Sequence, residues 1–592
     1  MTALGIPALD LVPLPVVVPL TVAMALLAVA HFLPARIPDA VTTLTALSVA
    51  AIAAVLAADS ARSGMLVYWF GGWTPRPGVV LGIGFGVDPA SAGVATFIGL
   101  LFAATIVFAW GYFDAVHAHF HVLMLLFLGA MEGFCLTRDL FNLFVWFEVM
   151  SVAAFALTAY RLERPSLVGA LNFTVTNSLA AFLMLSGIGL IYARVGALDF
   201  QALSTAIARQ GVDPVVIGSF CLLATALMIK AAIVPFHFWL SDAHAVAPSP
   251  VCVIFSGAMV SVGLFALAKL AFWIFAGSPE AQFLVRGCFM VLGAATAVLA
   301  ALTAWAQRHL KRLLAFSTIA HLGIMLTGIA AMSRAGLAGL FVYIVGHGLV
   351  KGALFMLAGM LLATRASIDE LELRGLGRGL APVGIAMALG GLLLGGAPWG
   401  VLDDGTRLVG AAARGETGIV VEGTIFFAAA VTGAAVLRAA GRIFLGLGEE
   451  PDPEEVEAPT EAEQAEADRP LWLMMTPCVV LLLLALLPGD LATKVAAVAA
   501  AGFGREAMAS ATSVTAAKLS DAAPAIATVG AIALAAFALS RDRLPALLNR
   551  TSDSVTGPLF HGLRLLHSGL VGDYVAWIVV GIAGFAVVLA FG

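Results

Sequence analysis

Ionisable side chains occur inside long apolar segments of this 592-residue sequence. A charge at the centre of a membrane helix costs about 2.5–3.5 kcal/mol on insertion scales, so such residues face the interior of a helix bundle and mark ion or proton pathways. We therefore expect proton or ion transfer rather than bond-breaking catalysis, and we assign no catalytic residue. The candidates are Glu132, Glu148, Lys230, His321, His347 and Lys351, with Lys269 as a further one.

Glu148 and Lys230 form the central pair among these candidates. Glu148 lies in "DLFNLFVWFEVM" and Lys230 follows "GSFCLLATALMI". Each is several residues from the expected end of its helix, so neither side chain reaches the interface easily. If they pair, the two charges neutralise one another and Lys230 gains a tunable proton affinity, as a relay element requires. The alternative is a buried ion pair that only fixes helix packing.

A helix break is predicted immediately after Lys230. Pro235 removes a backbone hydrogen bond and kinks or interrupts the helix. The polar tail that follows, "HFWLSDAH", begins with His237 and needs water or polar partners at membrane depth. The sequence therefore predicts a hydrated cavity beside the lysine.

A second break is predicted in "GGLLLGGAPWGVLDDG", where Pro398 leads into Asp403 and Asp404. Two interrupted helices in corresponding places are typical of an inverted-repeat transporter whose half-helices meet at the membrane midplane. The alternative is a pair of ordinary proline-kinked helices.

His347 and Lys351 lie four residues apart in "YIVGHGLVKGALFML" and so share one helix face. Histidine exchanges protons near neutral pH, and His321 in "FSTIAHLGIML" offers a further step. The three residues suggest that a proton path continues from Lys230. The alternative is that they are hydrogen-bonded core residues without a transport role.

Metal and cofactor chemistry has little support in the sequence. The cluster His117, His119 and His121 imitates a metal site, but its position at a helix start favours a peripheral solvated group. The five cysteines form no CxxC pair, so neither a disulfide framework nor an iron–sulfur site is indicated. We expect no metal, no cofactor and no nucleic-acid partner, and any redox chemistry must lie in other chains.

The elements that position these residues are membrane-spanning helices. With 61% hydrophobic and 11% charged residues, the chain cannot be a soluble domain. Its apolar runs are continuous rather than alternating, which excludes a β-barrel. The pattern predicts an all-α polytopic membrane protein with sixteen helices: 11–34, 39–57, 91–111, 117–136, 140–160, 168–193, 215–240, 249–274, 284–304, 312–333, 337–363, 380–402, 419–445, 471–488, 522–540 and 569–591.

Five segments follow from this pattern. We expect N-terminal transmembrane helices over 1–116, inverted five-helix repeats over 117–274 and 275–445, an acidic linker over 446–470, and C-terminal helices over 471–592. Within the last segment, the Ala-rich stretch 490–518 is typical of an interfacial amphipathic helix. A slight excess of Lys and Arg in alternate connections favours both termini outside the cytoplasm.

The motifs resemble the antiporter-like subunits shared by Mrp-type cation/proton antiporters, respiratory complex I and membrane-bound hydrogenases. "DLFNLFVWFEVM" is similar to the family's fifth-helix motif and "KAAIVPFHFWLSDAHAVAPSPV" to its broken seventh helix. "LKRLLAFSTIAHLG" and "GHGLVKGALFMLAG" resemble the tenth and eleventh helices. The resemblance implies about fourteen core helices, two inverted repeats, a central hydrophilic axis, and partner subunits in a bacterial or archaeal inner membrane. The ending "LHSGLVGDYVAWIVVG" resembles versions with extra C-terminal helices.

Three departures from the family pattern stand out. Ser261 occupies the place of a lysine that many relatives carry, and Glu132 is an additional acid. The family's "GLPPFxGFxSK" is replaced by "GAPWGVLDDG", with aspartates instead of a terminal lysine or glutamate.

The expected function is thus a translocase subunit without a redox centre of its own, moving protons, with Na⁺ as a candidate counter-ion. The alternatives are a degenerate, non-conducting scaffold subunit and, less favoured, a solitary transporter of an organic solute.

Overall fold

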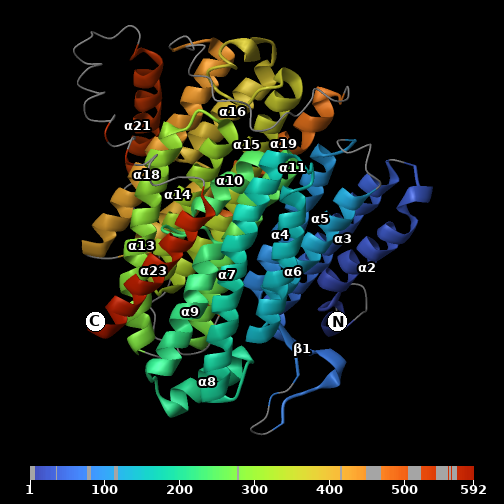
Figure 1. The fold of residues 1–592 in the computed structure, drawn as a ribbon, viewed down its shortest axis with the longest axis vertical. Helices are drawn as coiled ribbons and strands as arrows, with labels where there is room; N and C mark the ends of the chain where they lie inside the picture. Colours follow the sequence, from blue (N-terminus) through green and yellow to red (C-terminus); the bar gives the residue numbers. More distant parts are fainter. Residues whose placement is uncertain are drawn as a thin grey trace.

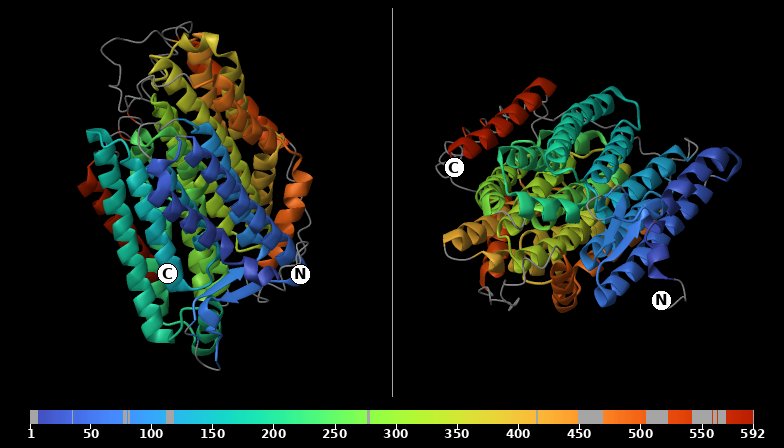
Figure 2. Two further views of the ribbon diagram at one scale, coloured as in Figure 1. Left: turned by 90° about the vertical axis from the view of Figure 1, so that its right-hand side faces the viewer. Right: turned by 90° about the horizontal axis from the view of Figure 1, so that it is seen from below.

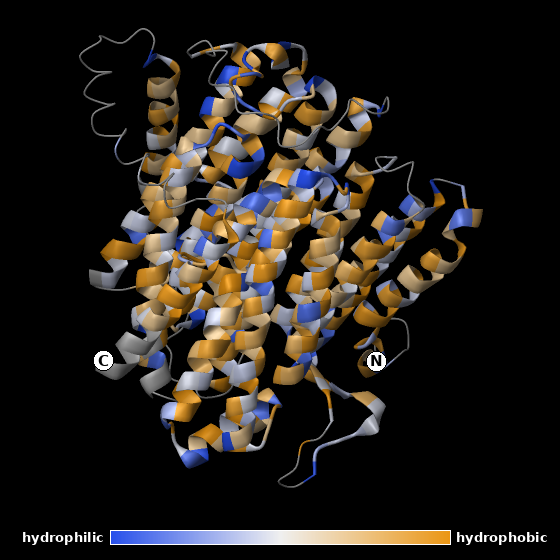
Figure 3. Ribbon diagram, viewed as in Figure 1, coloured by the Kyte–Doolittle hydropathy of each residue, from blue (hydrophilic) through white to orange (hydrophobic). Residues whose placement is uncertain are grey.

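The protein is an elongated bundle of long helices, as the computed structural model shows (Figure 1). The structure describes residues 7–34, 36–76, 80, 82–111, 118–275, 279–413, 416–448, 469–503, 522–541, 558, 562 and 570–591. Within them, eleven helices are long and apolar enough to cross a membrane. Orange residues dominate the outer helices, while blue residues recur in the middle of the bundle as well as at its ends (Figure 3).

The helices follow the predicted order along the chain. The first half contains α1 Ala8–Leu11, α2 Leu14–Val29, α3 Ile37–Ser63, α4 Pro89–Phe108, α5 His119–Leu136, α6 Leu140–Thr158, α7 Arg164–Val195, α8 Phe200–Gln210, α9 Pro214–Lys230, α10 Phe238–Val246, α11 Ser249–Ile254 and α12 Val260–Lys269. The second half contains α13 Pro279–Ala306, α14 Leu310–Ala330, α15 Arg334–Arg365, α16 Ala381–Leu394, α17 Val401–Ala412, α18 Glu416–Ala440, α19 Leu471–Ala485, α20 Gly489–Gly502, α21 Ala522–Leu539 and α23 Val571–Phe591. Short π-helical turns join α11 to α12 and extend α12 and α18. The all-α polytopic prediction is confirmed.

Two elements were not predicted. A two-stranded antiparallel sheet pairs β1 (Leu66–Trp69) with β2 (Gly84–Val87) at one end of the bundle. Its strands have only four residues each, too few to give a clear alternation in the sequence. The short amphipathic helix α8 is set by its N-cap, since the Asp199 carboxylate accepts a hydrogen bond from the Ala202 amide at 3.0 Å.

The backbone repeats itself within the chain. The Leu140 amide donates to the Leu198 carbonyl at 2.9 Å, and the Leu310 amide donates to the Ile368 carbonyl at 3.0 Å. The Phe200–Arg138 bond (2.9 Å) recurs in the same way between Glu370 and Arg308 (3.1 Å). Both bonds of the second set are displaced along the chain by the same interval from those of the first. The helices α5 to α12 and α13 to α18 thus repeat one backbone pattern along the chain.

Each repeat also carries a buried cation at the same place. The Lys269 ammonium donates to the Cys135 and Thr137 carbonyls at the end of α5. The Arg438 guanidinium donates to the equivalent carbonyls of Trp305 (2.6 Å) and Gln307 (2.9 Å) after α13. These cations satisfy carbonyls that a helix C-terminus leaves unpaired.

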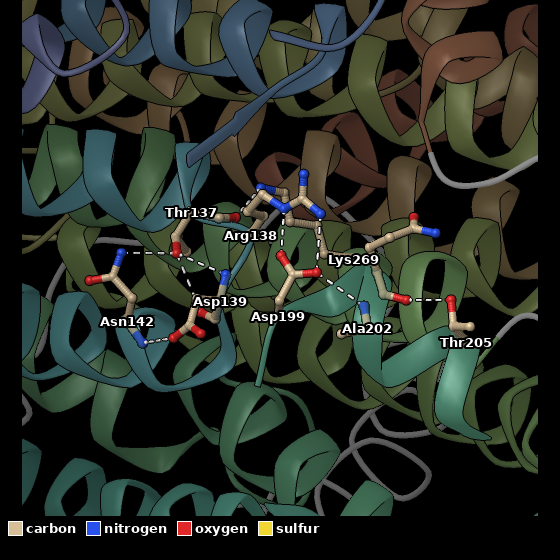
Figure 4. A network of polar contacts seen from close by, with 9 residues as sticks. Thr137, Arg138, Asp139, Asn142, Asp199, Ala202, Thr205 and Lys269 are labelled. Atoms are coloured by element: carbon tan, nitrogen blue, oxygen red, sulfur yellow. Dashed lines mark hydrogen bonds and ion pairs between the residues drawn. The ribbon is translucent and has the colours of Figure 1, made fainter. Parts of the chain in front are cut away.

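The first repeat adds a polar network around that position. Arg138 forms two hydrogen bonds with Asp199, at 2.6 and 3.1 Å, which tie the start of α6 to the start of α8 (Figure 4). Thr137, Asp139 and Asn142 bond to one another beside it (Figure 4). The network fixes the α5–α6 corner, from which α6 carries the first functional residues into the bundle.

The C-terminal segment packs around the repeats as appended helices. α19 and α20 lie along α4 and α15, α21 lies along α18, and α23 lies on the outer flank of α7 and α9 (Figures 1 and 2). Of the predicted acidic linker, residues 449–468 lie outside the described part of the chain, and so does 504–518 of the predicted amphipathic stretch. The boundaries of the five predicted segments remain predictions.

Close packing at the second helix break generates a stability prediction. A Cβ added at Gly433 of α18 would lie 2.3 Å from the Gly395 Cα, whereas one added at Gly423 of the same helix would meet nothing within 4 Å. Gly433→Val should therefore destabilise the protein by about 1–3 kcal/mol through overpacking, measured as a lower melting temperature in detergent. Gly423→Val is the control and should melt as the wild type does. Equal melting temperatures for both variants would contradict the packing argument.

Candidate functional site

The first helix break lies where the sequence predicts it. α9 ends at Lys230 and α10 begins at Phe238, with Pro235 in the irregular connection between them. The chain turns at Ala232, which adopts a positive φ of 51°. The Ile229 carbonyl accepts from the Ala232 amide at 3.0 Å and from the Trp239 indole at 2.9 Å, which ties α10 to the end of α9. The lysine is thus the last helical residue before a gap in the helix.

Lys230 is fully buried against α6. Its Nζ atom donates to the Ser151 hydroxyl at 2.8 Å and lies 4.8 Å from the centre of the Phe147 ring. These contacts give the ammonium a hydrogen-bond acceptor and a cation–π partner inside the bundle. Ser151 is therefore a site residue that the sequence analysis missed, although it lies one turn after the motif glutamate.

Glu148 does not form the expected ion pair. Its attraction to Lys230 is electrostatic only, and within the described chain its carboxylate has neither a hydrogen bond nor an ion pair. Phe147 and Ser151 share the inward face of α6, and Glu148 is rotated about 100° from Phe147. Glu148 therefore lies partly exposed on the flank of the bundle, and the predicted direct pairing is wrong.

The second break has the same backbone as the first. The Ile233 amide donates to the Met228 carbonyl at 3.0 Å, and the Ala397 amide donates to the Leu392 carbonyl at 3.0 Å. Aligning these two bonds places Leu394, the last residue of α16, at the position of Lys230. Pro398 lies in the gap before α17. The two breaks are therefore alike in backbone and different in the side chain that precedes them.

The second repeat carries its own buried polar groups. His321 bonds through Nδ1 to the Tyr343 hydroxyl at 2.8 Å and through Nε2 to the Thr432 hydroxyl at 3.1 Å. The His347 ring lies 5.5 Å from the His321 ring, and neither of its nitrogens has a hydrogen-bond partner in the described structure. Lys351, one turn along α15, donates to the Leu314 carbonyl at 3.1 Å and to the Ser317 hydroxyl. The structure thus brings together the three residues predicted from α14 and α15.

Two further buried groups connect the repeats. His244 of α10 is fully buried, stacks on the Phe355 ring at 4.6 Å, and has no hydrogen bond on either ring nitrogen within the described residues. Lys311 at the start of α14 is also fully buried and donates to the Ala247 carbonyl at 3.0 Å. His244 interacts electrostatically with both Lys311 and Lys351. The sequence places His244 in a polar tail and Lys311 in a loop, because it does not show that these connections fold into the bundle.

A cavity of about 40 Å³ lies beside the second break, which is room enough for water. His321 and Leu394 line its inner end, and Asp403, Arg407 and the exposed Glu422 also line it. The Asp403 carboxylate is paired with the Arg407 guanidinium at 2.7 Å. Leu394 occupies the position in the second repeat that Lys230 occupies in the first. The cavity beside His321 is therefore bordered by a leucine side chain, which is shorter than a lysine and apolar.

Asp404 also belongs to α17, but its side chain lies against the start of α20. A Cβ on Gly489 would overlap the Asp404 carboxylate. Asp404 does not line the cavity. Of the two predicted aspartates, only Asp403 is close to the buried histidines.

The remaining predicted residues lie apart from this chain of groups. Glu132 is fully buried in α5, and neither carboxylate oxygen has a hydrogen-bond partner within the described residues. His237 lies in the first break, with its ring against Phe238 at 4.1 Å. Ser261 is fully buried in α12.

The predicted solvated histidine cluster is partly wrong. His121 is 7% exposed and bonds to the Asp39 carboxylate of α3 at 2.8 Å, because α5 packs against α3 at this level. His119 is exposed, and His117 lies outside the described residues. No group of three His, Cys, Asp or Glu side chains is placed to hold a metal ion in the part of the chain that the structure describes.

The chain is similar to known proteins over most of this site. The model of the family described as "NADH:quinone oxidoreductase/Mrp antiporter, TM" matches residues 137–402. NADH-quinone oxidoreductase subunit N of Desulforudis audaxviator is 34% identical over 352 residues, which cover 58% of this chain and 68% of the relative. The putative antiporter subunit mnhD2 of Staphylococcus aureus is 30% identical, over 56% of this chain and 65% of the relative.

Solved structures share the fold. A chain in the Mrp complex of Dietzia sp. DQ12-45-1b superposes with a TM-score of 0.74 at 24% identity. The superposition covers 84% of this chain and 98% of that one. The protein therefore belongs to the NADH:quinone oxidoreductase/Mrp antiporter transmembrane family.

Proposed function

We propose that this protein is an ion-translocating membrane subunit of a multisubunit complex, of the Mrp antiporter or complex I type, that moves protons and exchanges them for Na⁺ where its complex couples the two ions. The observation that carries the proposal is the burial of Lys230 at a helix break, with a hydrogen-bonding hydroxyl beside it. A buried ammonium is costly to maintain and is retained in membrane helices mainly where an ion or proton passes.

A succession of buried groups supports a route across the two repeats. From Lys230 it would continue through His244 and the lysines Lys311 and Lys351, and then through His347 to His321. The centres of the His321 and His347 rings lie 5.5 Å apart, and neither His347 nitrogen has a hydrogen-bond partner within the described residues. A water molecule or a side-chain movement must therefore complete that step. The cavity lined by His321 and Asp403 would serve as the exit.

Glu148 would act at the entrance side. Glu148 is partly exposed on the flank of α6, where Val152 is 61% exposed. A carboxylate on such a flank within a membrane needs water or a polar neighbour, which a partner subunit can supply. This supports assembly with other membrane subunits, and the driving force would come from a partner redox module or an opposing ion gradient.

We further propose that the protein resides in a bacterial or archaeal inner membrane with both termini outside the cytoplasm. The relatives named above come from bacteria. The slight excess of Lys and Arg in alternate connections supports the orientation.

One observation favours the alternative of a non-conducting scaffold. Leu394 replaces the lysine of the first break in the second repeat, and Asp403 is occupied by an ion pair with Arg407. A subunit that had lost its second half-path would keep the fold and the partner contacts but conduct nothing.

Lys230→Ala tests the proposed relay. Proton movement in membrane vesicles that contain the whole complex, followed with a pH-sensitive dye, should fall about 100-fold, because a positioned proton-transfer group contributes that much or more. The complex should still assemble, as judged by co-purification. Lys494→Ala, at an exposed position of α20, is the control and should retain the wild-type rate. A wild-type rate in Lys230→Ala would exclude the relay role.

Asp403→Asn separates the conducting subunit from the scaffold. If the cavity beside His321 is the exit, the same assay should show a rate about tenfold lower, since the change removes a proton-accepting carboxylate together with its ion pair to Arg407. Asp404→Asn is the matched control and should change the rate little, because Asp404 does not line the cavity. Unchanged transport in Asp403→Asn would favour an exit elsewhere, and no transport by the wild type would favour the scaffold.

A further inference from the structure

The C-terminal helix α23 lies against the first helix break. It crosses the outer flank of α7 and α9, and both views place it on the outside of the bundle (Figures 1 and 2). A hydrogen bond between α23 and α10, the half-helix after the break, joins residues that are 332 positions apart in the chain. Nothing in the proposed proton route uses this helix.

Tyr574 provides the polar contact. Its hydroxyl donates to the Asp242 carboxylate at 2.6 Å, and the Asn172 side-chain amide of α7 donates to the same carboxylate oxygen at 3.0 Å. Tyr574 is 2% exposed, so its hydroxyl is committed to this bond inside the protein. Asp242 belongs to α10, the half-helix that follows the break. The bond therefore connects the C-terminal helix α23 to the second half of the broken helix, α10.

The same face of α23 makes the apolar contacts. The Tyr574 ring stacks on Phe238 at 5.2 Å with an interplanar angle of 7°, and Trp577 lies 6.1 Å from the same ring. One turn further, a Cβ on Gly581 would lie 2.4 Å from the Phe236 ring and 3.3 Å from Pro235. Residues at this spacing share one helix face, so α23 presents a continuous surface to the break.

The break needs such support because its own backbone is not held by a helix. Between Lys230 and Phe238 the regular pattern of helical hydrogen bonds is interrupted. The half-helix that follows is held by side-chain contacts instead, with α7 and α14 on the bundle side and with Tyr574 of α23. α23 lies beside α7 and α9 and adds contacts to Pro235, Phe236 and Asp242 from that side.

We propose that Tyr574 is a positioning residue, which through Asp242 holds the half-helix α10 against the bundle and so maintains the surroundings of Lys230. The part of this inference that concerns transport rests on the proposed function; the part that concerns the position of α10 does not. The C-terminal helix is then a strap over the first break, and its loss loosens the segment that carries His237 and His244.

The test measures the position of α10 directly. Ser241 is fully buried in α10, so a cysteine introduced by Ser241→Cys should react slowly with a water-soluble maleimide in the full-length protein. Tyr574→Phe keeps the aromatic stack but removes the hydroxyl, and Gly581→Leu pushes α23 away from Phe236 and Pro235. Each should raise the labelling rate about tenfold, the factor expected from the loss of one hydrogen bond to an ionisable group or of a close packing contact.

Two controls make the effect specific. Gly584→Leu adds the same side chain to α23 where a Cβ meets nothing within 4 Å, and it should leave labelling unchanged. Background labelling is taken from the same protein without Ser241→Cys, which retains the five natural cysteines. In an Asp242→Ala background, Tyr574→Phe should add nothing further, because the two changes remove the same bond. Additive effects would mean that Tyr574 does not act through Asp242.

Proton movement is measured in the same variants. Tyr574→Phe and Gly581→Leu should lower it, and Gly584→Leu should not. Wild-type labelling in both Tyr574→Phe and Gly581→Leu would overturn the inference. If the labelling changes as expected while the wild type itself moves no protons, the positioning role of Tyr574 stands and the proposed function fails.

Discussion

A charged group at membrane depth must receive its polar neighbours from the protein, because the hydrocarbon offers none. In this molecule the polar neighbours of three buried lysines come from other helices and connections. Lys230 ends a half-helix and reaches the Ser151 hydroxyl, and Lys351 reaches a carbonyl and a hydroxyl of α14. Lys311 similarly reaches the Ala247 carbonyl in the connection after α10. Hydroxyl groups and backbone carbonyls of neighbouring segments thus replace water around each of these three ammonium groups.

The two repeats meet this requirement in different ways on one backbone. The backbone hydrogen bonds that recur at the helix corners align Ser151 with His321, and those that recur at the breaks align Lys230 with Leu394. The first repeat pairs a hydroxyl with a lysine. The second pairs a histidine with a leucine and leaves a cavity of about 40 Å³ beside it. A relay built this way would use a lysine as the charged carrier in one half and histidines next to a hydrated space in the other.

The appended helices extend this arrangement outward. α23 covers the first break with Tyr574 and Gly581, while Gly489 at the start of α20 lies against Asp404. Both breaks are therefore contacted by segments that follow the repeats in sequence. The partly exposed Glu148 marks another place where the isolated chain leaves a polar group uncovered, and a neighbouring subunit fits that flank.

The sequence by itself determined the long apolar helices, both breaks and the buried positions Glu132, Lys230 and Lys351. These follow from local properties: apolar runs of membrane length, proline and glycine in the middle of two of them, and ionisable residues inside the apolar runs. Only the tertiary structure decided which groups meet. The rotation of α6 directs Ser151 rather than Glu148 at Lys230, and the fold of the α10–α11 connection brings Lys311 into the bundle beside His244. The sequence of one helix does not contain its rotation relative to its neighbours, because that angle is set by the packing of all the helices together.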